Sequence, residues 1–447
     1  MLLKFAATAT LVLAANCQTL DQAKRAFDAQ RYGEAAQLFE AARQRDPACE
    51  ISFYLGVTRY RLHQADAALI AFQEAAKCDP KLTVAHVALG EAYAERGNDA
   101  EALAAYERAL RVDPNNASGL RGAAALYLRG KLNDKAAAAL LVLVKLEPGD
   151  AQAHADLGAA YFGMSNQEGA EKEFREALRL NPKSAAALLG VGNVLLRKGE
   201  DEHAVEALRR AVGLSPKAYE PRFVLGSAYN RLGRFKEAAA ELEAAVRLGG
   251  AESEVFYHLA RAYGGLGRTE QRSAALAKFA ELGRQAKADT EARREALKLV
   301  AQAKSLVEAG DLENALARME QARDLRPQDD SVLFRVASLD YDLAHYGEAR
   351  DRIQEALALA PSEWVYHLLL GLIEGRLGRL DQARASLRVA VRLNPSAADA
   401  HNALGEVAMR QGDASAAEAS FRTASELDPG QAAYRVNLEN ARKAAAK

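Results

Sequence analysis

Apolar residues recur at helical spacing along most of this 447-residue chain, in runs separated by short polar turns. The stretch at residues 88–114 reads ALGEAYAERGNDAEALAAYERALRVDP. It predicts a helix, a turn at Gly97–Asp99, a second helix, and a stop at Pro114. The pattern therefore predicts an all-α fold built from short paired helices.

Prolines mark the end of most of these helix pairs. They recur every 33 or 34 residues at Pro47, Pro80, Pro114, Pro148, Pro182 and Pro216, and again at Pro327, Pro361, Pro395 and Pro429. A fixed period of this length predicts a solenoid in which each unit packs against its neighbours. The register gives about twelve units, which begin near residues 16, 49, 83, 117, 151, 185, 219, 253, 296, 330, 364 and 398.

Small and large residues hold fixed places within a unit. In the unit at 83–116 they are Leu89, Gly90, Tyr93, Ala102, Tyr106, Ala109 and Pro114. The unit at 151–184 repeats them as Leu157, Gly158, Tyr161, Ala170, Phe174, Ala177 and Pro182. This pattern resembles the tetratricopeptide repeat. The resemblance implies a right-handed superhelical solenoid of antiparallel helix pairs, with the first helix of each pair lining a concave groove.

The repeats are interrupted once. From Gly250, which holds a proline position, to Pro327 is nine residues more than two periods, and the surplus falls in QAKADTEARREALK at 285–298. We expect one array of about eight repeats at 18–284, a charged helical joint at 285–295, a second array of four repeats at 296–431, and a capping helix at 432–447. A slightly irregular connection without mechanical meaning is the alternative for the joint.

The N-terminus has the layout of a secretory signal peptide, which we place at 1–17. Met1–Lys4 is a short positive start, Phe5–Ala15 is apolar, and small residues surround the end of that run. The sequence thus predicts export, with a periplasmic or secreted mature chain that has no integral membrane segment. An apolar first helix is one alternative. Lipid attachment at Cys17 is another, although Asn16 stands where a lipoprotein signal has Gly or Ala.

The sequence carries no recognisable catalytic or cofactor motif. Neither a GxGxxG fingerprint nor a phosphate-binding GxxxxGK[ST] loop occurs, and no histidine lies near a cysteine at the spacing of a metal site. The formal net charge is −1 and the basic residues are dispersed, which argues against nucleic-acid binding. We therefore expect no enzyme activity, no cofactor and no metal.

The resemblance implies that positions 2, 5, 9, 12 and 13 of each unit face the groove. These positions hold aromatic residues at Phe53, Tyr60, Phe162, Phe223, Tyr257, Phe334 and Tyr341. Position 13 holds arginine at Arg61, Arg129, Arg197, Arg231, Arg376 and Arg410. Arginine beside aromatic residues is typical of binding hot spots. The alternative is that these arginines pair with neighbouring acids and only solvate the ridge.

The sequence thus predicts a non-enzymatic scaffold that binds a protein ligand, either a peptide or a helix, in the groove. Two other functions use the same surface. One is a periplasmic assembly factor or co-chaperone for envelope proteins, and the other is a regulatory or accessory subunit of an envelope enzyme.

Two cysteines, Cys49 and Cys78, open the first helix and close the second helix of one unit. In an antiparallel pair these two ends are adjacent, at a distance that a disulfide can span. We expect a disulfide between them, which fits an exported chain. The alternative is two buried free thiols in positions that other units fill with apolar residues.

Overall fold

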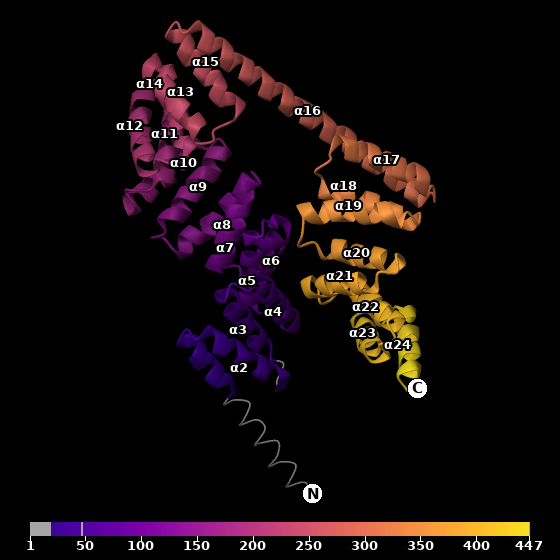
Figure 1. Cartoon of the computed structure of the whole chain (residues 1–447). Helices are drawn as coiled ribbons and strands as arrows, with labels where there is room; N and C mark the ends of the chain where they lie inside the picture. The colour runs from indigo at the N-terminus through magenta and orange to yellow at the C-terminus, as the bar shows by residue number, and fades with distance from the viewer. Residues whose placement is uncertain (1–18, 46–47, 447) are drawn as a thin grey trace. The chain divides into compact units, whose positions relative to one another are not determined.

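The computed structural model describes residues 19–45 and 48–446 (Figure 1). The expected signal peptide, including Cys17, lies outside the described residues, as does Pro47. Every regular element in the described part of the chain is an α-helix, and the helices stack in antiparallel pairs as an all-α superhelical repeat array. The chain divides into two compact units after Gln285.

The first unit begins with a helix at 19–28 that pairs with α2 (Tyr32–Arg45). The pairs that follow are α3 (Cys49–Arg61) with α4 (Ala65–Cys78), α5 (Thr83–Glu95) with α6 (Asp99–Val112), α7 (Ala117–Arg129) with α8 (Asn133–Leu146), α9 (Ala151–Gly163) with α10 (Gln167–Leu180), α11 (Ala185–Lys198) with α12 (Asp201–Leu214), and α13 (Tyr219–Arg231) with α14 (Phe235–Arg247). The first helix of the last repeat in this unit is α15 (Ser253–Gly265), and α16 (Thr269–Glu308) follows it.

In the second unit the C-terminal part of α16 packs with α17 (Leu312–Leu325), and three helix pairs and the closing helix α24 (Ala432–Ala445) follow. The pairs are α18 (Asp330–Asp342) with α19 (Tyr346–Leu359), α20 (Trp364–Arg376) with α21 (Leu380–Leu393), and α22 (Ala398–Arg410) with α23 (Ala414–Leu427). Here α24 packs on the last pair, where Leu438 and the buried Ala441 join Phe421 in one apolar cluster.

The turn between the two helices of each pair contains a residue with a left-handed backbone conformation, at position 15 of the repeat. Seven units place glycine there, as at Gly97 with φ 76° and Gly412 with φ 81°. Other units hold a residue with a side chain in the same conformation, such as Lys131 at φ 57° and Ala344 at φ 64°. The turn geometry thus belongs to the repeat, and glycine is the residue that adopts it without steric cost.

Close packing between pairs depends on one large side chain near the middle of each second helix. In α6 this side chain is Tyr106, which is buried. A Cβ atom on Gly90 of α5 would lie 2.5 Å from the Tyr106 ring, and one on Gly122 of α7 would lie 2.3 Å from it. The ring therefore fills a gap between two successive first helices, and it explains why those helices need glycine at the crossing points.

The 40-residue helix α16 contains the boundary between the two units. Its N-terminal part belongs to the first unit, where Ala275 joins the apolar core. Its C-terminal part belongs to the second unit, where Ala296, Leu299 and Ala303 pack with Met319 of α17. The expected joint at 285–295 thus lies within a continuous helix.

Candidate binding groove

The first helices α3 and α5, Phe72 of α4 and the start of α7 line an open cavity of about 300 Å³ in the first unit, which we call the α3–α5 cavity. Apolar side chains form most of its wall, and they include Phe53, Val57, Phe72, Val84 and Val87. Polar side chains contribute Tyr60, Arg61, Glu91, Asn116 and Ser118. Most of these residues occupy the positions that the sequence predicts for the groove.

Aromatic contacts and one hydrogen bond shape this cavity. The rings of Phe53 and Phe72 lie 6.0 Å apart, and Phe72 also packs against Gly56 of its own unit. The hydroxyl of Tyr60 donates a hydrogen bond to Glu95, and this bond raises the pKa of Tyr60. Desolvation by burial, and next the charge of Glu95, raise the pKa of Glu91. The cavity therefore disfavours the negative charge of Glu91 more than water does.

Two of the predicted groove arginines form ion pairs with the preceding repeat. Arg129 donates to both carboxylate oxygens of Asp99, at 2.6 and 2.8 Å. Arg231 pairs with Asp201 in the same way, with N–O distances of 2.9 and 3.0 Å. In both cases the acid is the first residue of the preceding second helix. These two guanidinium groups already have a carboxylate partner.

Three others contact the preceding first helix. The Arg197 guanidinium lies 3.7 Å from the ring centroid of Phe162 and donates to its carbonyl oxygen at 3.2 Å. Arg376 donates to the hydroxyl of Tyr341 at 3.1 Å, and Arg410 donates to the carbonyl oxygen of Gly375 at 2.6 Å. These contacts tie successive first helices together, so each of these arginines has an internal role.

Arg61 differs from the other five. It is exposed at the wall of the α3–α5 cavity. Among the described residues it forms no hydrogen bond or ion pair, and the residue equivalent to Asp99 and Asp201 in the preceding unit is Tyr32. Arg61 thus retains its full capacity to bind a carboxylate of a ligand.

The remaining predicted residues lie in three other places. Phe223 packs edge-on against His258 at 5.6 Å, and Tyr257 contacts His258 at 5.4 Å and Phe279 at 5.7 Å. In the second unit, Phe334 lines a cavity of about 250 Å³ between α16 and α18. Tyr341, Arg376 and Arg410 line a smaller one of about 160 Å³. The predicted residues therefore form several separate clusters.

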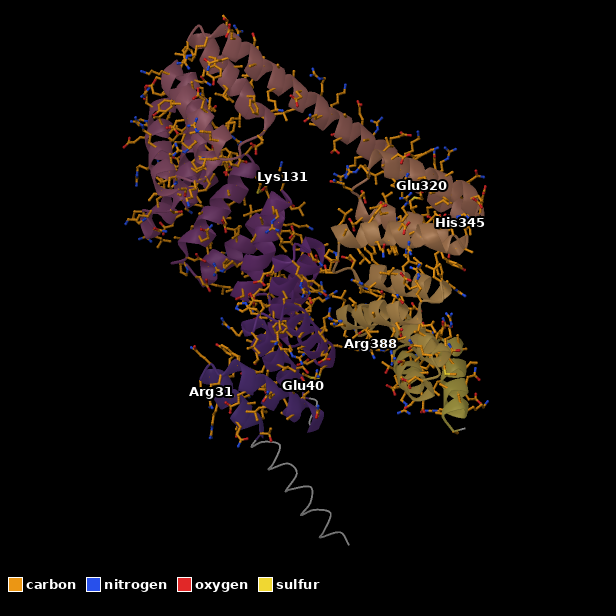
Figure 2. All side chains as sticks on the ribbon, viewed as in Figure 1. Arg31, Glu40, Lys131, Glu320, His345 and Arg388 are labelled. Carbon is orange, nitrogen blue, oxygen red and sulfur yellow. A yellow bond between two sulfur atoms is a disulfide. The ribbon has the colours of Figure 1, made fainter. Side chains whose placement is uncertain are left out.

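Charged side chains outside the groove form ion pairs within and between helices, as around Glu40 and Glu320, which Figure 2 labels. Glu40, labelled in Figure 2, accepts hydrogen bonds from Arg43 at 2.5 Å and Arg59 at 2.8 Å. Glu320, labelled in the second unit, pairs with Arg323 and lies 3.9 Å from Arg352. Because these groups link neighbouring helices, they are structural contacts of the repeat.

Neither a metal-binding cluster nor a membrane-spanning helix occurs among the described residues. They contain no group of three or more histidine, cysteine or acidic side chains that could hold a metal ion. No helix among them is long and apolar enough to cross a bilayer. Four histidines at the same repeat position each contact a proline carbonyl oxygen, as His86 does with Pro80 at 3.0 Å. Such histidines fasten the turn between two units.

Cys49 begins α3 and Cys78 ends α4, so the two residues close one helix pair. Their Cα atoms lie 5.3 Å apart and their sulfur atoms are at bonding distance. This separation is within the usual range for a disulfide. The oxidised state of the pair in the purified protein stays a prediction.

Comparison with known families identifies the repeat. The sequence profile of the tetratricopeptide repeat matches residues 20–82, 84–116, 155–219, 202–253, 336–388 and 368–432, more than half of the chain. The chain belongs to the tetratricopeptide repeat family. Repeats of this family act as scaffolds for protein–protein interaction, and their partners are proteins.

Several solved structures are similar to this tetratricopeptide repeat array. MamA from Desulfovibrio magneticus RS-1 is 23% identical over 38% of this chain and 95% of its own, with a TM-score of 0.35. A tetratricopeptide repeat protein from Parabacteroides merdae is 16% identical over 56% and 99%, with a TM-score of 0.40. The structure of Naa15/Naa10 bound to HypK-THB is 16% identical over 92% and 68%, with a TM-score of 0.36. No curated protein matches the chain.

Sequence reasoning found only part of the α3–α5 cavity. It named Phe53, Tyr60 and Arg61, which line one cavity. It did not name Val57 and Val87, although both occupy groove positions, because aromatic and arginine side chains are typical of binding hot spots and valine is not. Reading all residue types at positions 5 and 9 of consecutive tetratricopeptide repeats would have found them.

Proposed function

We propose that this protein is a non-enzymatic scaffold that holds a peptide or helix of a partner protein in the α3–α5 cavity. The observation that supports this most strongly is the convergence of groove positions from successive first helices on one largely apolar cavity of about 300 Å³. Ligand pockets begin at about this volume, and they combine an apolar wall with a few polar groups. Phe53 and Arg61 provide that combination here.

Site-specific photo-crosslinking in the producing cells tests this function. A photoreactive amino acid at Val84, on the exposed rim of the cavity, should crosslink to a discrete partner protein. The matched control is Leu141 on the second helix α8, which is also an exposed apolar residue. Equal crosslinking from both positions would contradict binding in the cavity. One stoichiometric partner fits a scaffold or accessory subunit, whereas many substoichiometric partners fit an assembly factor.

Export of the chain is part of the same proposal. Its supports are the signal-like sequence at 1–17 and the position of Cys49 and Cys78 at the two ends of one helix pair. A disulfide closing a loop of this length stabilises a fold by about 3.5 kcal/mol in the chain-entropy model. Such stabilisation is available only where thiols oxidise.

Intact-mass analysis with and without reduction tests the export proposal. Protein purified from the oxidising compartment should begin after the signal sequence and should gain two hydrogens on reduction. The variant carrying Cys49→Ala and Cys78→Ala should show no mass change on reduction and should unfold at lower denaturant. Two free thiols in protein from the oxidising compartment would contradict the disulfide, and an intact Met1 there would contradict signal cleavage.

A further inference from the structure

We propose that the α3–α5 cavity selects a peptide segment with three features: a large apolar side chain, an acidic group that Arg61 binds, and a basic or hydrogen-bond-donating group that Glu91 binds. This inference rests on the proposed function, because it names the chemistry of the ligand at that same cavity. It goes further in assigning opposite charges to the two flanks of the apolar side chain.

The wall of the α3–α5 cavity carries two opposite charges. Among the described residues that line it, Arg61 and Glu91 alone are charged, one of each sign. They form no ion pair with each other, and neither forms a hydrogen bond with another described residue. The cavity thus presents two unmatched charges of opposite sign beside an apolar surface. A ligand with only one charge would leave the other group without a partner.

Arg61 lacks the carboxylate partner that two of its equivalents in other repeats have. Arg129 and Arg231 occupy the same repeat position, and Asp99 and Asp201 neutralise them. For Arg61 the corresponding residue is Tyr32, so the preceding unit offers no carboxylate there. Arginine binds carboxylates in a planar, two-bond geometry, which makes an acidic side chain the matching partner for Arg61.

Glu91 also lacks a partner among the described residues. Its neighbour Glu95 already accepts the hydrogen bond of Tyr60, whereas Glu91 has no such donor among the described residues. Glu91 is exposed at the cavity wall, and desolvation and the nearby Glu95 raise its pKa, so no described side chain stabilises its negative charge. A lysine, arginine or other donor of the ligand would supply that compensation.

The apolar wall defines the third feature of the ligand. Phe53, Val57, Phe72 and Val87 surround the cavity between the two charges. Burying a leucine, phenylalanine or tryptophan against them removes the largest apolar area from water, and this term dominates the affinity at such sites. We therefore expect an apolar anchor with acidic and basic residues on its two sides.

Selection from a phage-displayed library of random twelve-residue peptides on the immobilised full-length protein tests this inference. Enriched peptides are then synthesised and titrated against four variants. Arg61→Gln and Glu91→Gln each remove one charge, and Arg129→Gln is the matched control because Arg129 already has Asp99. Val84→Arg at the exposed rim blocks the cavity without altering the core. Circular dichroism verifies that each variant is folded.

The expected result is a consensus with one apolar residue flanked by an acid and a base. Arg61→Gln and Glu91→Gln should each weaken binding about tenfold, which is typical for the loss of one charge-assisted hydrogen bond. Arg129→Gln should leave binding unchanged. Replacing the acid of the peptide by glutamine should cost affinity against wild type and nothing against Arg61→Gln, and the base should behave likewise with Glu91→Gln.

Two other results overturn different statements. If peptides lose binding in Val84→Arg but bind Arg61→Gln and Glu91→Gln as tightly as wild type, the charge assignment is wrong and the scaffold function stands. If no enriched peptide depends on Val84, the cavity is not the binding site and the proposed function fails with the inference. Binding that weakens equally in Arg129→Gln would show a general charge effect and would also contradict the inference.

Discussion

Leucine occupies the same repeat position in the interior of the first unit and in α16 at the end of that unit, but its exposure to solvent differs between the two. Leu208 in α12 and Leu242 in α14 are 0% exposed, whereas Leu276, at the equivalent position in α16, is 40% exposed. Three positions later, Ala211 and Ala245 are fully buried, but Phe279 is 37% exposed. A residue at this position is therefore buried by the neighbouring repeat as well as by its own helix.

The sequence between the two regions explains the difference. Most other second helices end before an Asp-Pro, Asn-Pro or similar pair, which stops the helix and lets the next first helix return across it. The helix α14 ends instead at Gly249-Gly250, where Gly249 adopts a φ of 98°. After Phe279 the chain reads AELGRQAKADTEARREALK, which has no proline and only Gly283 to weaken the helix. Helix-favouring residues thus continue α16 through the position where another unit would turn.

Truncating the buried leucine should lower the stability of the protein more than any other substitution considered below. Leu208→Ala should lower the free energy of unfolding by about 3–4 kcal/mol, because it leaves a cavity between two packed helices. Leu276→Ala should cost about 1 kcal/mol, because much of that side chain already contacts water. Urea denaturation followed by circular dichroism measures both. Similar losses in the two variants would show that Leu276 is buried in solution.

The packed repeats and α16 also differ in the space around their glycines. A Cβ atom on Gly190 would lie 2.3 Å from the Phe174 ring, whereas a Cβ atom on Gly283 in α16 would have no neighbour within 4 Å. Gly190→Ala should therefore destabilise the first unit by about 2–3 kcal/mol through overpacking. Gly283→Ala should stabilise α16 by about 1 kcal/mol through helix propensity. Thermal unfolding with opposite shifts in melting temperature is the expected readout. A downward shift for Gly283→Ala would indicate that the helix breaks there.

The turns between paired helices, which α16 lacks along its length, should give the smallest change in stability. Ala344 turns α18 into α19 with φ 64°, a conformation that costs a residue with a Cβ atom roughly 1 kcal/mol. Ala344→Gly should raise the stability of the second unit by about 0.5–1 kcal/mol. The reverse change at the equivalent Gly412, Gly412→Ala, serves as the control and should lower stability by a similar amount. Denaturant midpoints that move in the same direction for both variants would contradict this account.

The period of the sequence predicted most of the fold, because proline, glycine and alanine report local requirements. Pro114 and Gly97 mark a helix end and a turn, and Gly90 marks a close crossing, so each can be read without its neighbours. The slot occupied by Tyr106 could likewise be predicted from the family pattern. What the pattern does not contain is the partner of each side chain in the adjacent unit.

The candidate site shows that limit at the arginines. Arg61, Arg129 and Arg197 occupy the same position and are indistinguishable within their own units. Comparison with the first residue of the preceding second helix separates Arg129 from Arg61. That residue is Asp99 for Arg129, which pairs with it, and Tyr32 for Arg61, which offers no carboxylate. The stacking of Arg197 on Phe162 depends on side-chain conformation and could not be read in that way.

The position of Tyr106 between Gly90 and Gly122 has a consequence for how such a chain can evolve. Because one ring belongs to two units, a duplication or deletion preserves the packing only if it spans whole repeats and rejoins the chain at the same position. Any other length would place a side chain where the ring needs a glycine. Whole repeats can therefore be added or lost without disturbing the packing, while selection acts on the residues that pack at the junction between two repeats.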